Sequence, residues 1–135
     1  MANKKTTTNE TNYSVAISES SKELTAKEKV MFKDVSDAVK LDEATKEAPV
    51  IIHPDYYLVL DVHNSKSTGN EDYQQYLVVD VDGTKYVTGS ASFWSSFLNI
   101  VAEMLDVTDE EWGVKVHREP SKNFKGKDFL TCSVI

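Results

Sequence analysis

Cysteine, glycine and proline are scarce in this sequence. Its 135 residues include one cysteine, five glycines and three prolines. The single cysteine, Cys132, excludes an internal disulfide, and its position in an apolar final segment predicts a small buried side chain rather than a nucleophile. Because the glycines stand singly, the phosphate-cradling glycine loop of nucleotide-binding proteins is excluded as well.

Long apolar runs are also missing. No stretch of about 18 apolar residues is present to span a bilayer, and residues 1–10 are polar where a signal peptide needs an apolar segment. The sequence therefore predicts a cytoplasmic protein that has no membrane partner.

Residues that carry chemistry are few and scattered. The soft metal ligands are His53, His63, His117 and Cys132, and none of them lies at the short spacing of a zinc site. The Gly-x-Ser-x-Gly pattern of a nucleophile elbow does not occur, and 22 acidic residues make any pair of carboxylates uninformative. We therefore expect a protein that is not an enzyme and that needs neither a metal nor a cofactor.

The chain has the composition and length of one globular domain, with 40% hydrophobic and 27% charged residues. Residues 1–29 are polar and predict a flexible tail, so the ordered domain is expected over residues 30–135. Within the tail, Tyr13, Val15 and Ile17 alternate like a short strand. One hypothesis is that this strand joins the sheet edge of a neighbouring copy and so builds a homo-oligomer, and the alternative is a disordered leader.

The domain is expected to be rich in β-strands with one helix. Residues 30–48 fit neither period well and are interpreted as short extended pieces. Residues 56–63 are a run rich in β-branched and aromatic side chains and predict a strand, and residues 73–81 predict a second one. Asp82-Gly83 then predicts a tight primed turn that leads into a strand over 84–88. After Ser90, a plausible cap, apolar residues recur every three or four positions as far as Asp106, which predicts a helix. Two further strands are predicted over 112–119 and 128–135.

A helix after three strands and before two is the order found in the OB-fold. The sequence thus favours a mainly β protein with a five-stranded OB-fold-like barrel, whose helix lies between the third and fourth strands. An open α+β sheet with the helix on one face is the alternative.

Alternation within the strands predicts which side chains face outward. We expect Leu58, Leu60 and Val62 to face the core, together with Leu77, Val79 and Val81 on the next strand. Tyr57 and Tyr76 then share the exposed face. Exposed aromatic rings are platforms on which the bases of single-stranded nucleic acid stack, although these tyrosines equally suit simple padding of the sheet.

Charge is unevenly distributed along the chain. Its 15 basic and 22 acidic residues give a net charge of -7. Residues 103–111 hold five acids and no base, whereas residues 112–127 hold five bases and one acid, Glu119. The segment 118–127 surrounds one aromatic residue, Phe124, with four cations, which is typical of single-strand binding. The alternatives are a solvated hairpin and a phenylalanine that packs against the barrel rim.

Several short motifs resemble those of a known family. They are Tyr-Val-Thr-Gly-Ser at 86–90, Val-Lys-Val at 114–116 and Pro-Ser-Lys-Asn-Phe-Lys-Gly-Lys-Asp-Phe-Leu-Thr-Cys at 120–132. Over residues 56–135 the sequence is similar to small single-stranded DNA-binding proteins of Gram-positive phages and conjugative plasmids. The resemblance implies an OB-fold that coats single-stranded DNA without sequence preference during phage replication or plasmid transfer. Cellular proteins of this function end in a disordered tail with an acidic tip, whereas this chain ends in the apolar segment 129–135.

These observations predict a DNA-binding surface of rings and cations. The stacking residues are expected to be Tyr57, Tyr76 and Phe124, and the phosphate partners to be Lys66, Arg118, Lys122, Lys125 and Lys127. The rival hypothesis is an acidic protein-interaction module, for example an inhibitor of a host enzyme whose carboxylates at 103–111 imitate a phosphate backbone.

Overall fold

The computed structural model describes residues 13–66 and 69–135. Along the chain the elements are β1 (Tyr13–Ser20), α2 (Ala26–Lys33), β2 (Val39–Lys40), α3 (Leu41–Ala44), β3 (Val50–Ile52), β4 (Pro54–Asn64), β5 (Asp72–Asp80), β6 (Lys85–Thr88), α4 (Ala91–Met104), β7 (Val114–Pro120) and β8 (Asp128–Val134). The prediction of a mainly β protein is confirmed.

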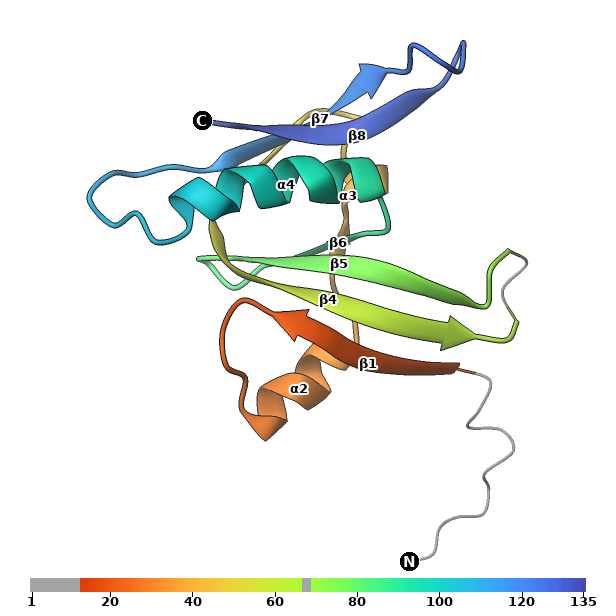
Figure 1. The fold of residues 1–135 in the computed structure, drawn as a ribbon, viewed down its shortest axis with the longest axis vertical. Coiled ribbons are helices and arrows are strands. Elements are labelled where there is room, and N and C mark those ends of the chain that lie inside the picture. Colours follow the sequence, from red (N-terminus) through yellow and green to blue (C-terminus); the bar gives the residue numbers. More distant parts are fainter. Residues whose placement is uncertain (1–12, 67–68) are drawn as a thin grey trace, which may run out of the picture.

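The strands form two separate sheets. The larger has the order β1-β4-β5-β6-β2, and the smaller has the order β3-β7-β8. Helix α4 lies between the two sheets, and α2 lies beside β1 at the far end of the long axis (Figure 1). The expected five-stranded OB-fold-like barrel is not formed as such, because the described strands lie in two sheets and close no barrel. An apolar helix that packs against both sheets holds them apart, so the last hairpin cannot close onto the first three strands.

The central meander follows the sequence prediction closely. Strands β4 and β5 pair antiparallel, with Leu58 opposite Leu77, and β5 pairs antiparallel with β6. The turn between β5 and β6 differs from the predicted primed turn, because Gly83 has a positive φ of 92° and Asp82 does not. Gly83 N–H donates to Asp80 O at 2.8 Å, and Asp80 N–H donates to Thr84 O at 2.9 Å. The loop thus has three residues and needs a positive φ only at its glycine.

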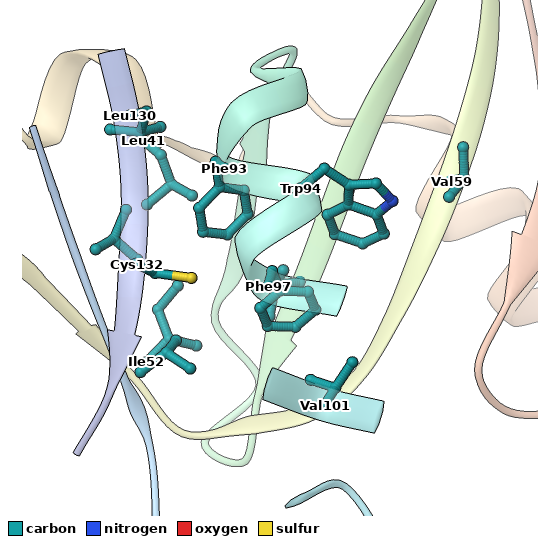
Figure 2. Packing of buried hydrophobic residues seen from close by; sticks show 12 residues of the cluster. Leu41, Ile52, Val59, Phe93, Trp94, Phe97, Val101, Leu130 and Cys132 are labelled. Carbon is teal, nitrogen blue, oxygen red and sulfur yellow. The ribbon is translucent and has the colours of Figure 1, made fainter. Parts of the chain in front are cut away.

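Helix α4 forms the centre of the main core. Ser90 caps it as predicted, since its hydroxyl oxygen accepts the N–H of Phe93 at 3.1 Å. Phe93 and Phe97 are fully buried between the sheets. Figure 2 shows Leu130, Cys132 and Ile52 on one side of the helix and Val59 on the other. A helix with apolar residues around so much of its circumference is stable only when it is covered on both sides.

The region predicted as a flexible tail contains ordered elements. Strand β1 pairs antiparallel with this chain's own β4, with Ile17 opposite Leu60. Helix α2 begins at a capping box in which Thr25 and Glu28 bond each other's backbone N–H groups. The tail prediction is therefore wrong for residues 13–29, and the strand belongs to its own sheet rather than to that of a neighbour. Residues 1–12 lie outside the described part.

Segment 30–48 also differs from the expected extended pieces, because it holds the end of α2, the short β2 and α3. Phe32 and Ala38 form a second core with Tyr56, Leu58 and Leu77 on the side of the large sheet opposite α4. Their burial explains the weak periodicity, since only single residues of this segment reach the core. None of the helices in residues 13–66 and 69–135 is long and apolar enough to cross a membrane.

Candidate nucleic-acid interface

The loop between β7 and β8, residues 121–127, is called the hairpin tip below. The two strands pair from Val114 opposite Val134 to Pro120 opposite Asp128. The loop is held closed by internal bonds, since Ser121 N–H donates to Lys127 O at 2.9 Å and Lys127 N–H donates to Phe124 O at 3.1 Å. The positive φ of Gly126, 80°, allows the chain to reverse. The hairpin tip is thus a structured turn at one end of the protein (Figure 1).

The hairpin tip exposes an aromatic ring among cations. Phe124 is 66% exposed, so it does not pack against a barrel rim. Lys122, Lys125 and Lys127 are exposed around it. Phe129, which is 40% exposed, lies at the start of β8 and lines the same hollow of about 570 Å³ as Phe124. A ring left in water does not gain the favourable free energy of burial. A ligand that covers the ring gains that free energy on binding.

The acids at the base of the hairpin are already paired. A carboxylate oxygen of Asp128 lies 2.8 Å from Nη1 of Arg118, and one of Glu119 lies 2.9 Å from Nε2 of His117. Among the described residues, the lysines of the hairpin tip form no ion pair. The tip is therefore a local positive surface on an acidic protein, and its lysines are available to an anion.

Arg118 does not belong to this available set. Its guanidinium donates to Asp42 O at 2.6 Å, to Thr45 Oγ1 at 3.2 Å and to Asp128 Oδ1 at 2.8 Å. These bonds join β7 to α3 and to β8. The predicted role as a phosphate partner is replaced by a structural one, because three of the five N–H donors of the guanidinium are engaged within the protein and its charge is paired with Asp128.

Replacement of Arg118 by alanine is expected to lower the free energy of unfolding by about 1–3 kcal/mol, because bonds to a charged group are lost around a buried threonine. Urea unfolding followed by circular dichroism measures this loss. Arg118→Lys keeps the charge but not the fork of donors, so it should be destabilised too. An Arg118→Ala variant as stable as the wild type would contradict the structural role of Arg118.

The two tyrosines predicted as exposed platforms pack against α4 instead. Tyr76 stacks on Trp94 with ring centroids 4.7 Å apart and planes 10° apart. Tyr57 makes edge contacts with Trp94 at 5.3 Å and with Phe97 at 5.7 Å. They share one face of the sheet as expected, but that face is covered. The prediction from alternation assumed that one face of the sheet is exposed to solvent. In the structure, α2 and α4 cover opposite faces of the sheet.

Lys66 is exposed in the β4–β5 loop, where its N–H donates to Asn64 Oδ1 at 3.0 Å. The end of β4 and the start of β5, next to this loop, lie on the same side of the view as the hairpin tip and are apart from it along the long axis (Figure 1). The structure thus brings Lys122, Phe124, Lys125 and Lys127 together and leaves Lys66 on a separate loop. Phe129 was missed because the sequence places it in an apolar strand, although Leu130, the next residue, is the one that faces the core.

Cys132 is buried as predicted. Burial raises the pKa of its thiol to about 12, so the reactive thiolate is not formed at neutral pH. Within the described ranges, no group of three or more His, Cys, Asp or Glu side chains is arranged to hold a metal ion.

Comparison with protein-family models, with curated proteins and with solved structures gave no match.

Proposed function

We propose that this protein binds single-stranded DNA through its hairpin tip, without sequence preference and without catalysing a reaction. The observation that carries the proposal is the 66% exposed ring of Phe124 among three exposed lysines whose neighbouring acids are paired elsewhere. A base stacks on such a ring whatever its identity, and lysines follow the phosphates. Phage replication or conjugative plasmid transfer in the cytoplasm is the process that the sequence resemblance suggests.

The arrangement of elements fits this proposal. We infer that β4, β5 and β6, followed by α4 and the β7–β8 hairpin, are an opened form of the OB-fold order, with α4 between the two parts. In an OB-fold the loop between the last two strands takes part in binding nucleic acid. The hairpin tip occupies the corresponding place along this chain.

Replacement of Phe124 by alanine tests the stacking role. Loss of one stacked base is expected to weaken binding to a labelled oligonucleotide by about 1–3 kcal/mol, which is about 5- to 150-fold. The thermal midpoint should stay unchanged, because the ring contributes little to the core. Fluorescence anisotropy and thermal unfolding measure the two quantities.

The matched control is Tyr13→Ala, which removes another exposed ring, 52% accessible, from β1. It should leave the affinity unchanged. Equal affinities of the wild type and Phe124→Ala for the oligonucleotide would show that no base stacks on Phe124.

The rival function, an acidic module that binds a basic host protein, is favoured by one observation. The acids of the α4–β7 loop, Asp106, Asp109, Glu110 and Glu111, are all exposed. This function predicts capture of a basic protein and no binding of oligonucleotides, so the wild-type titration distinguishes the two proposals.

A further inference from the structure

A second surface of this protein has the chemistry that complements the hairpin tip. It is a groove of about 520 Å³ where the β3–β4 junction, the β5–β6 turn and the α4–β7 loop meet. We call it the acidic groove. Its apolar lining includes Val81, Val107 and Trp112, and the carboxylates that line it are those of Asp55, Glu110 and Glu111.

The apolar part of the groove is left open. Val81 is 67% exposed, although the alternation over residues 73–81 predicts that it faces the core, because it follows β5 and lies in the turn. Among the described residues, no cation pairs with Asp55, Glu110 or Glu111. Uncovered apolar surface bordered by carboxylates fits a partner that presents a hydrophobic side chain among cations.

The groove is also preformed. The buried carboxylate of Asp80 accepts His53 N–H at 2.8 Å and Asp82 N–H at 3.0 Å, and Val81 N–H donates to His53 O at 2.9 Å. These bonds fasten the β5–β6 turn to the β3–β4 junction. This part of the groove is therefore ordered before a partner binds, which lowers the entropic cost of binding there.

We propose that the acidic groove binds the hairpin tip of a second copy of this chain. Phe124 of one protomer covers Val81, Val107 and Trp112 of the next, and its flanking lysines face the carboxylates of the groove. The two surfaces are complementary, because each combines exposed apolar area with charges that form no ion pair among the described residues, and one is basic while the other is acidic.

A protomer cannot fill its own groove. The hairpin tip follows Pro120, and the groove includes Trp112 just before Val114, so the seven residues of β7, at about 3.3 Å each, separate the two by about 20 Å. Figure 1 shows the tip and the α4–β7 loop on opposite sides of the view. The contact is thus head-to-tail, and such a contact builds open chains unless the rotation closes a ring.

This association uses the same hairpin tip as the proposed function but does not depend on it. The groove carboxylates would face the same lysines that DNA phosphates would contact. The acidic groove and single-stranded DNA therefore compete for the hairpin tip. Adding single-stranded DNA should therefore release the head-to-tail contact, and raising the salt concentration should weaken it.

Sedimentation velocity over a series of protein concentrations tests the contact. At about 0.1 M salt, where charges more than about 10 Å apart are screened, the full-length wild type should self-associate. Glu110→Gln/Glu111→Gln should weaken this association about tenfold by removing two of the charges that face the tip. The control Glu23→Gln/Glu47→Gln changes the net charge equally at exposed sites outside the groove and should associate like the wild type.

Cysteine exchange identifies the two partners directly. Asn123→Cys and Thr108→Cys, exposed neighbours in the hairpin tip and in the acidic groove, keep Phe124 and the groove carboxylates. Mixed under mild oxidation, these variants should form mixed disulfide dimers faster than either variant forms its own dimer. The native Cys132 does not interfere, because it is buried. Mixed dimers that form no faster than the symmetric ones would overturn the head-to-tail contact.

The outcomes separate this inference from DNA binding. A wild type that stays monomeric, or a Glu110→Gln/Glu111→Gln variant that associates as strongly as the wild type, overturns the inference while leaving the oligonucleotide titration intact. Association that survives in a protein with no affinity for oligonucleotides supports the inference and removes the proposed function. In the groove variant, affinity for DNA should be unchanged or higher, because the competitor is weaker.

Discussion

Replacement of Lys122, Lys125 and Lys127 by alanine is expected to give the largest loss of DNA binding. Each phosphate contact on a single strand contributes about 0.7 to the slope of the logarithm of the binding constant against the logarithm of the salt concentration, so the slope should fall by about two. Affinity at low salt should fall with it. Anisotropy titrations of a labelled oligonucleotide at several salt concentrations measure both changes.

A matched variant separates the place of these charges from their number. Lys27, Lys29 and Lys33 lie exposed on α2, which is far from the hairpin tip along the long axis (Figure 1). Their replacement by alanine changes the net charge equally and should leave the slope nearly unchanged. If both triple variants lose the same affinity, net charge controls binding and the hairpin tip has no special part in it.

Replacement of Phe97 by alanine is expected to have the largest effect on stability. The ring is fully buried and contacts Phe93 at 5.6 Å, Trp94 at 5.2 Å and Tyr57 at 5.7 Å between centroids. Because it fills the space between the two sheets, its removal should lower the free energy of unfolding by about 3–5 kcal/mol. Urea unfolding of the variant and the wild type measures the difference.

Leu98, the next residue on α4, provides the control. Its side chain is 37% exposed, so Leu98→Ala leaves a smaller cavity, and its cost should be well below that of Phe97→Ala. Similar costs at the two positions would contradict the packing of α4 between the sheets.

The elements from β4 onward could be predicted from the sequence because each carries a strong local signal. Apolar alternation predicted β4, β5 and β7, a glycine turn predicted the β5–β6 hairpin, and the spacing after Ser90 predicted α4. Strand β1 was missed for a physical reason. Its apolar residues, such as Tyr13 and Ile17, are too few to offset the loss of chain entropy by themselves. They become ordered because they pair with the edge of β4.

The candidate site was predicted in part, and its two failures share one cause. The residues of the loop, Lys122, Phe124, Lys125 and Lys127, were recognisable because loop residues reach solvent whatever the tertiary packing. Tyr57 and Tyr76 lie in β-strands, where the exposure of a side chain depends on which elements cover the sheet. The alternation within one β-strand does not show which faces are covered. Arg118 likewise depends on α3, which is distant in sequence.

The acidic groove lay outside the reach of sequence patterns for the same reason. The acids at 103–111 are visible in the sequence, but Asp55 and Val81 join them only through the β3–β4 junction and the β5–β6 turn. A run of acids alone indicates a solvated loop. The acids together with the exposed Val81 form a surface that complements the hairpin tip.

Titration of the wild-type protein against labelled single-stranded DNA and against the corresponding duplex, at about 50 mM and about 200 mM salt, tests the central claim most directly. The account predicts binding to the single strand that weakens with salt, and weaker binding to the duplex, whose bases are not free to stack on Phe124. Absence of binding to the single strand, or binding that does not respond to salt, would contradict it.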